Sequence, residues 1–307
     1  MQSAAFVPKA NGRHGARRHR TRLVAVHSIR GGSGKSHLAA NLAYLAARAG
    51  AKVAALDADM QAPTLHALFG IEPKQVLHSL SEFIRGRCEI GEVPIDLTRQ
   101  LDSESRDGRL HCIPSSSDLE TMTSILFEGY NVARLNEGLH ALGRDLELDY
   151  LLLDTHLGFN RETLLSLAIC DTVIVLLRPD RLDHQGSGVL VEIATKLGIP
   201  SLLLVPNMIA AEHDAEEVGA QVAEEFGVPV AGVLPWCEEL REFGDRLFAA
   251  HHPDHPFTLA LERIRQQAMP VHEPQGEAHD LDREDGRLAH GQEGGCPLRG
   301  SDEVCSG

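Results

Sequence analysis

A short segment near the N-terminus combines glycines, a lysine and a hydroxyl in an order that can hold phosphate. It follows the apolar run 23–27 and reads Arg30, Gly31, Gly32, Ser33, Gly34, Lys35, Ser36. Glycines let backbone N–H groups turn inward around phosphate oxygens, and the N-terminus of a following helix adds a favourable dipole. In such a loop Lys35 reaches the β- and γ-phosphates of a nucleotide, and the Ser36 hydroxyl ligates Mg²⁺. An ordinary glycine-rich turn would not explain this strand–loop–helix context.

Carboxylates follow two further apolar runs. The run 52–56 is followed by Asp57 and Asp59, and the run 150–153 ends at Asp154. In an open α/β sheet the ligand lies beside the carboxyl ends of the strands, so these acids are expected near the phosphates. Asp154 can hold Mg²⁺ through water. For Asp57 and Asp59 the alternative is that they only cap a strand end.

These segments resemble the MinD/ParA family of P-loop ATPases over about residues 23–260. The general P-loop pattern has Gly six residues before the Lys, where this chain has Ile29. The loop is similar instead to the deviant form of this family, Lys-Gly-Gly-x-Gly-Lys-Ser/Thr, with Arg30 at its first position. In the family that first Lys crosses a dimer interface to contact the partner's nucleotide. The resemblance implies the same role for Arg30, whose guanidinium can bind phosphate bidentately.

The resemblance also implies roles for the acids. Asp59 would orient or deprotonate the attacking water, and Asp57 would support Mg²⁺ and the loop. Gly158 fits a turn that senses the γ-phosphate, and Leu157 stands where the family has Pro. His156 is open to two interpretations, a switch residue or an unassigned loop histidine.

The base-reading positions are weaker signals. Asn207 follows the run 201–205, and in the family an Asn here reads the adenine edge. GTP-binding relatives have Asp three residues later, where this chain has Ala210, so the resemblance favours ATP. A second wall of the base site would be formed by Pro235, Trp236, Cys237 and Glu238. Trp236 has the alternative of being a partly buried core aromatic.

The elements that must position these residues alternate along the chain. Near-continuous apolar runs, typical of buried parallel strands, cover 23–27, 52–56, 110–113, 150–153, 172–177, 201–205 and 230–234. Helical stretches that stop at Gly cover 36–49, 184–197 and 211–226. This alternation predicts an α/β fold with a doubly wound, mostly parallel sheet and helices on both faces. We expect a P-loop domain over 23–270, between a disordered basic arm at 1–22 and a disordered acidic tail at 271–307.

Charge and composition narrow the choice of partner. The formal net charge is -15, yet residues 1–22 carry six Lys or Arg and no acid. Any DNA or anionic lipid must therefore contact a local basic patch, such as the arm. The residues Phe257, Leu261, Ile264 and Ala268 predict an amphipathic helix, which can pack on the sheet or target a membrane. Packing is favoured because an acidic tail follows.

The metal and redox signals are sparse. Six Cys form no C-x-x-C pair, so the sequence indicates neither a zinc site nor a redox dithiol. The histidines of 251–255 lie in a loop with Pro, and no cysteine or acid pair nearby completes a ligand set. No apolar run approaches the roughly 20 residues that span a bilayer, and the thiols are typical of the cytosol.

The resulting hypothesis is a cytoplasmic ATP hydrolase with slow intrinsic turnover that uses ATP and Mg²⁺ and forms an ATP-dependent homodimer. It would position a cargo such as a replicon, a division-site regulator or a protein assembly, with a partner protein stimulating hydrolysis. A membrane or nucleoid surface, reached through the arm or the amphipathic helix, stays open. Alternatives of the same fold are a metal-cluster carrier or reductase, a small-molecule ligase, and a tyrosine autokinase, which needs a Tyr-rich C-terminus.

Overall fold

The computed structural model describes residues 20–101, 107–244 and 246–271. Most of the predicted arm and tail therefore lie outside the described residues. The end of the predicted arm does not: Arg20 forms an ion pair with Asp171 (2.7 Å), and Arg22 is the first residue of a strand. Residues 20–22 of the predicted arm therefore contact the domain.

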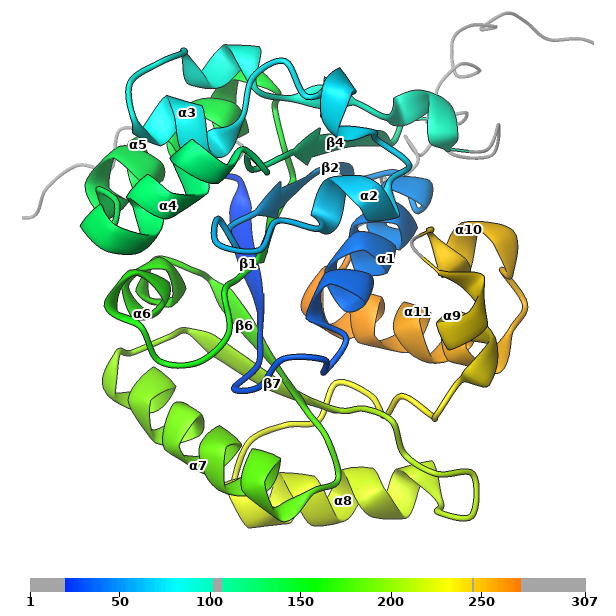
Figure 1. Ribbon diagram of the computed structural model, residues 1–307. Coiled ribbons are helices and arrows are strands. Elements are labelled where there is room, and N and C mark those ends of the chain that lie inside the picture. Colours follow the sequence, from blue (N-terminus) through cyan, green and yellow to red (C-terminus); the bar gives the residue numbers. More distant parts are fainter. Residues whose placement is uncertain (1–19, 102–106, 245, 272–307) are drawn as a thin grey trace, which may run out of the picture. The chain divides into compact units, whose positions relative to one another are not determined.

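Seven strands within the described residues form one sheet in the order β3-β4-β2-β5-β1-β6-β7 (Figure 1). The edge strand β3 is antiparallel to β4, and all other neighbours are parallel. The strands are β1 (Arg22–His27), β2 (Lys52–Asp57), β3 (Ile95–Asp96), β4 (Arg109–Ile113), β5 (Tyr150–Asp154), β6 (Thr172–Leu177) and β7 (Ser201–Pro206). The predicted doubly wound, mostly parallel α/β fold is confirmed.

Helices cover both faces of this sheet (Figure 1). Alternate residues of β1 separate two cores: Val24 and Val26 face one, Leu23 and Ala25 the other. The first core includes residues of α1 (Lys35–Arg48), α2 (Leu65–Leu68), α10 (Phe248–His251) and α11 (Pro256–Ala268), and α9 (Glu238–Phe243) packs against it. The second includes residues of α3 (Leu80–Ile84), α4 (Leu119–Glu128), α5 (Val132–Asp145), α6 (Arg161–Ala168), α7 (Arg181–Lys196) and α8 (Ala215–Phe226).

Two predicted helices begin at different residues because side chains cap them elsewhere. The helix α7 starts at Arg181, three residues early, since the Asp180 carboxylate accepts the Asp183 N–H (3.0 Å). The helix α8 starts four residues late, because Asp214 accepts the N–H groups of Glu216 and Glu217. Both are ordinary N-caps, which satisfy free backbone donors at a helix start.

The predicted strand 230–234 is wrong. The chain forms only isolated bridges to its neighbours there, between Leu204 and Val230 and between Ile209 and Pro235. These bridges use the N–H groups of Ala231, which donates to the Leu204 carbonyl, and of Trp236, which donates to the Ile209 carbonyl, and the residues between the two bridges form no further bridge. The segment still runs beside β7 and carries Pro235 to the ligand side of the sheet.

The predicted amphipathic helix packs inside the domain. In α11 the side chains of Phe257, Leu261, Ile264 and Ala268 are all buried, in the core shared with α1. The packing interpretation is therefore confirmed for this helix. No helix in the described ranges has both the length and the apolar character needed to cross a bilayer.

Candidate functional site

The phosphate loop connects β1 to α1. Gly32 and Gly34 have φ of +70° and +92°, a left-handed conformation that L side chains rarely adopt. Gly34 is also the N-cap of α1, so the first free N–H groups of this 14-residue helix face the loop rather than a capping side chain. Backbone donors at a helix N-terminus form an anion site. The sequence prediction of a strand–loop–helix unit here is confirmed.

Three residues outside the glycines hold the loop in shape. The buried Ser33 hydroxyl donates to Ser28 Oγ (2.7 Å), and Ser28 Oγ donates to the Arg30 carbonyl (3.0 Å). From the end of β7, Asn207 Nδ2 donates to the Ser33 carbonyl (2.8 Å), while its Oδ1 accepts the Met208 N–H. Asn207 therefore braces the phosphate loop, and its predicted contact with adenine stays a prediction.

Asp57 is fully buried at the end of β2 and serves the backbone. One oxygen accepts the Asp59 N–H (3.2 Å), and the other accepts the N–H groups of Thr64 and Leu65 (both 3.0 Å). Burial, reinforced by the nearby Asp154, raises the pKa of Asp57 well above its ordinary value. These bonds hold the segment that follows β2, and the predicted support of the phosphate loop and of Mg²⁺ by Asp57 stays a prediction.

Asp154 differs from Asp57 in the hydrogen bonding of its carboxylate. It is buried at the end of β5, directly beside Asp57 in the parallel register, yet neither of its carboxylate oxygens has a hydrogen-bond partner among the described residues. Burial raises its pKa to about 6, and the neighbouring Ser36 hydroxyl and Lys35 ammonium oppose this shift only in part. A buried carboxylate without donors beside a hydroxyl fits a hard divalent cation, which prefers oxygen ligands.

We therefore expect Asp154→Asn to stabilise the protein when nucleotide and Mg²⁺ are both absent. The folded-state pKa of Asp154 is about 6 and the reference value is 3.8. Because the folded value is the higher one, stability is lost as the pH rises between these two values. Above this window the charged group is unfavourable by up to about 3 kcal/mol. The variant should show a higher free energy of unfolding above pH 6 and little difference near pH 4.

Urea unfolding in EDTA, at several pH values across this window, measures the effect. Asp145→Asn is the matched control, because Asp145 is an exposed carboxylate on α5 and should change stability by less than about 0.5 kcal/mol. A destabilised Asp154→Asn protein at pH 7.5 would show that the buried carboxylate has partners in the folded protein.

Asp59 is held by a histidine. His156 Nδ1 lies 2.7 Å from Asp59 Oδ1, which also accepts the Ala62 N–H (3.2 Å). Both side chains are mostly buried, with 14% of Asp59 and 22% of His156 exposed. The pair follows from the sheet register: Asp57 and Asp154 are neighbours, and each partner lies two residues further along. The interpretation of His156 as an unassigned loop histidine is wrong, since it fixes the carboxylate predicted to act on water.

Arg30 is the first residue of the phosphate loop, and its guanidinium forms an ion pair within its own chain. Its Nη1 is 3.2 Å from Asp180 Oδ1, with 42% and 41% of the two side chains exposed. Arg178 also contacts Asp180 (3.1 Å). The structure therefore contains the bracing contact that competes with a role across a dimer interface. An exposed pair of this kind is weak and can exchange for a phosphate partner.

A pocket of about 370 Å³ opens on the other side of the loop. Its walls include the predicted base residues Asn207, Pro235 and Trp236 together with Gly32 and Gly34. Trp236 is 51% exposed and donates through Nε1 to Glu238 (3.1 Å), so it is not a core aromatic. The fold thus brings both predicted base walls to the phosphate loop.

Two contacts at the site were missed in the sequence. Thr64 Oγ1 donates to Ser36 Oγ (3.4 Å), which ties the loop after β2 to the expected cation ligand. His27, buried at the end of β1, is hydrogen-bonded through Nδ1 to Thr155 Oγ1 (2.7 Å), and the Thr155 hydroxyl donates to the Val26 carbonyl (2.8 Å). Burial, with Lys35 nearby, lowers the pKa of His27 to about 3, so it is neutral. His27 and Thr155 could have been found from their places at strand ends, whereas Thr64 directly precedes the short helix α2.

The chain matches known proteins over most of this domain. The description CobQ/CobB/MinD/ParA nucleotide binding domain matches residues 24–247. An ATP-binding protein of Methanocaldococcus jannaschii is 30% identical over 78% of this chain and 85% of that protein. An iron-sulfur cluster carrier protein of Pseudomonas fragi is 30% identical over 79% and 83%.

The fold is also found in solved structures. The septum site-determining protein MinD of Pyrococcus horikoshii, solved with Mg-ADP, aligns with a TM-score of 0.68 at 18% identity, over 81% of this chain and 96% of that one. The structural match agrees with the family match, and the phosphate loop lies inside the matched residues. The protein therefore belongs to the CobQ/CobB/MinD/ParA family of nucleotide-binding domains, as its deviant phosphate loop indicated.

Proposed function

We propose that this protein is an ATP-dependent, dimerising ATPase that acts as a positioning switch. The observation that carries the proposal is the deviant phosphate loop, which lies between the base pocket and a cluster of three carboxylates, Asp57, Asp59 and Asp154. One side of the loop can hold a base and the other can hold a cation and a water molecule. The same arrangement of parts serves phosphoryl transfer in P-loop enzymes.

ATP is the proposed nucleotide and Mg²⁺ the proposed cation. Gly31, Gly32, Ser33 and Gly34 would supply backbone donors to the phosphates, and Lys35 would neutralise the β- and γ-phosphates. Ser36 and Asp154 would hold Mg²⁺, and Asp57, the neighbour of Asp154 on the adjacent strand, would support the cation. When bound, the cation supplies charge that offsets the negative charge of the phosphates. The names of the M. jannaschii and P. horikoshii relatives, which mention ATP binding and Mg-ADP, support this assignment.

Hydrolysis would depend on Asp59. Its carboxylate lies at the ligand edge of the sheet and is held in one orientation by His156 (2.7 Å). A fixed carboxylate can accept a hydrogen bond from the attacking water and place it in line with the γ-phosphate. His156 is a positioning residue in this scheme, because it acts on the water through Asp59.

Dimerisation would depend on Arg30. We expect Arg30→Ala to bind ATP as a monomer, to dimerise poorly and to hydrolyse ATP slowly. Loss of a charge-assisted hydrogen bond to phosphate should weaken the ATP-bound dimer by about 10-fold or more. Light scattering with ATP measures the dimer, and turnover in the wild type should rise with protein concentration.

The matched control for Arg30 is Asp180→Asn. Asparagine keeps the N-cap of α7 but removes the in-chain partner of Arg30. If Arg30 acts across the interface, Asp180→Asn should dimerise at least as well as the wild type. If Asp180→Asn instead reproduces the defect of Arg30→Ala, Arg30 only braces its own loop.

A mixed dimer gives an independent measurement of the same role. Combining Arg30→Ala with Lys35→Ala pairs an ATP-competent subunit with a partner that retains Arg30. Some turnover should return in the mixture if the guanidinium reaches across. Mixed dimers that form by light scattering but show no activity would contradict the role in trans.

A positioning switch needs a surface to which its ATP-bound dimer attaches. We place the protein in the cytoplasm, where the ATP-bound dimer would attach to a membrane or to DNA and an activating partner would trigger release. The site-determining name of the P. horikoshii protein supports positioning as the class of function. Cosedimentation with anionic liposomes and with DNA, each with and without ATP, tests this proposal. Failure to dimerise with ATP and to bind either surface would reject it.

A metal-cluster carrier is the second candidate, favoured by the 30% identity to an iron-sulfur cluster carrier protein. Cluster ligation uses several cysteine thiolates. The sequence has no C-x-x-C pair, and Cys112 and Cys170 are buried in the two cores. Anaerobic reconstitution with iron and sulfide distinguishes the candidates, since a carrier would gain cluster absorbance and a positioning switch would not.

A further inference from the structure

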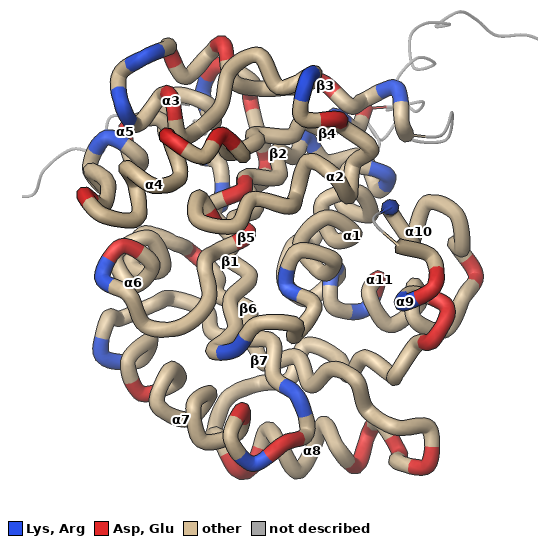
Figure 2. Tube along the Cα trace, viewed as in Figure 1, with Lys and Arg blue, Asp and Glu red and all other residues tan. Residues whose placement is uncertain are grey.

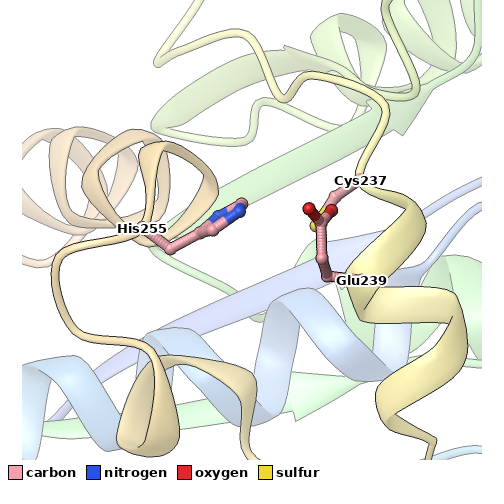
Figure 3. A group of neighbouring side chains, drawn as sticks. All are labelled: Cys237, Glu239 and His255. Atoms are coloured by element: carbon pink, nitrogen blue, oxygen red, sulfur yellow. The ribbon is translucent and has the colours of Figure 1, made fainter.

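Three side chains of different ligand types meet at the starts of two helices, and none of them belongs to the phosphate loop. One donor atom from each of Cys237, Glu239 and His255 lies within 4.8 Å of the others. Figure 3 shows the imidazole of His255 pointing across a gap toward Cys237 and Glu239. Cys237 and Glu239, which the sequence did not associate with the histidines of 251–255, therefore lie beside His255.

Helix caps fix two of these groups. Cys237 is the N-cap of α9, and its sulfur accepts the Leu240 N–H (3.3 Å). His255 is the N-cap of α11, and its Nδ1 accepts the Phe257 N–H (3.1 Å). The Phe248 ring packs edge-on against the imidazole with ring centroids 5.1 Å apart, which limits its rotation. The two half-buried donors are thus held by backbone elements, and the exposed Glu239 completes the group.

The surroundings favour a cation. The helix α9 carries Glu238, Glu239 and Glu242 against one base, Arg241, which is paired with Glu238 (Figure 2). The Cys237 thiol donates to Glu239 Oε2 (3.6 Å). Burial, with a contribution from Glu239, raises the pKa of the Cys237 thiol. A divalent cation between these groups would take the place of the thiol proton and offset the negative charge.

We propose that Cys237, Glu239 and His255 form a Zn²⁺ site. Thiolate, imidazole and carboxylate are the three protein donors that zinc uses, whereas Mg²⁺ prefers oxygen alone. Three protein ligands leave a fourth, tetrahedral position for water. On binding, Zn²⁺ forms a bond to the Cys237 sulfur and the thiol proton passes to solvent.

Small side-chain movements complete the site. Tetrahedral zinc places its donor atoms roughly 3.5 Å apart, so distances of up to 4.8 Å must shorten by about 1 Å. Glu239 is exposed and can change rotamer without disturbing the core. A neutral metal-bound imidazole carries its remaining proton on the other nitrogen, so coordination through Nε2 would replace the cap bond from Phe257.

The position of the site connects it to the base pocket. Cys237 lines that pocket, one residue after Trp236. Zinc would link the start of α9, which follows the base wall, to the start of α11, which packs on α1. The site is independent of the proposed ATPase chemistry, because none of its ligands belongs to the phosphate loop or the carboxylate cluster.

The test is a Zn²⁺ titration of the full chain against a chromophoric chelator, in excess Mg²⁺. Cys296 and Cys305 lie outside the described residues and are replaced by Ser throughout. We expect one Zn²⁺ per chain at a site that requires all three ligands. Cys237→Ser and His255→Gln should each weaken binding by about 100-fold, since even outer partners of a metal site contribute roughly 10- to 100-fold. Glu239→Gln, at an exposed position, should weaken it by about 10-fold or more without affecting folding.

Cys88→Ser is the matched control, because Cys88 is also a half-buried thiol surrounded by glutamates. It should bind Zn²⁺ like the wild type. Replacing Zn²⁺ by Co²⁺ should give a thiolate charge-transfer band that is lost in Cys237→Ser. Absence of binding, binding that survives in the Cys237→Ser, Glu239→Gln, His255→Gln triple variant, or a Co²⁺ spectrum without the thiolate band would each overturn the proposal.

Discussion

Lys35→Ala should lower the affinity for ATP by at least about 100-fold, because the loop loses the positive charge that faces the β- and γ-phosphates. Lys35 is 8% exposed at the first position of α1 and lies close enough to Asp154 and His27 to shift the pKa of each group. Removing it leaves the phosphates facing Asp154 without a compensating cation. Electrostatic terms in a buried site are larger than at the surface, so this loss should exceed that of any exposed lysine.

Isothermal titration calorimetry with Mg-ATP measures the affinity. Lys196→Ala is the control, since Lys196 is an exposed lysine in the last turn of α7 and should leave ATP affinity unchanged. Urea unfolding of Lys35→Ala without nucleotide checks the fold, since the variant must unfold cooperatively for its affinity to be informative. Near-native ATP affinity in folded Lys35→Ala would show that the phosphate loop has been assigned incorrectly.

Local patterns predicted the parts of the site that are continuous in sequence. The run from Arg30 to Ser36 needs only a strand before it and a helix after it, and the backbone geometry of Gly32 and Gly34 follows from their types. Asp57 and Asp154 were placed at the ligand edge because apolar strands end there. What these patterns could not give was strand order. Only the pairing of β2 with β5 brings Asp59 to His156, and no spacing along the chain encodes that pairing.

The C-terminal part shows the same limit more strongly. Cys237 and His255 come together because the chain turns back between α9 and α11, and Phe243 and Phe248 pack together along this path (5.8 Å between ring centroids). Apolar periodicity predicted the helix α11 but not the helix α9, which begins beside Cys237. Periodicity also misread 230–234, where the run is apolar but the chain pairs with its neighbours only through the bridges at Val230 and Pro235.

Asp59→Ala should keep ATP binding and lose turnover by about 100-fold or more. A group that orients water acts mainly in the transition state, so its removal lowers the rate without lowering ground-state affinity. Within the described residues the Asp59 carboxylate makes no hydrogen bond to the phosphate loop, and its partners are His156 and the Ala62 N–H. The ATP-bound dimer should therefore still form and should persist, which light scattering after ATP addition can follow alongside phosphate release.

A double-mutant cycle separates Asp59 from the histidine that holds it. His156→Ala should lower turnover by about 10-fold, because a carboxylate that is free to rotate spends less time aligned with the water. If His156 acts only through Asp59, adding His156→Ala to Asp59→Ala should cause no further loss of turnover, because both substitutions remove the same orienting effect on the water. Additive losses would mean that His156 contacts the nucleotide or the water itself. An Asp59→Ala protein that hydrolyses ATP at the wild-type rate would remove Asp59 from the mechanism and leave the attacking water to another group.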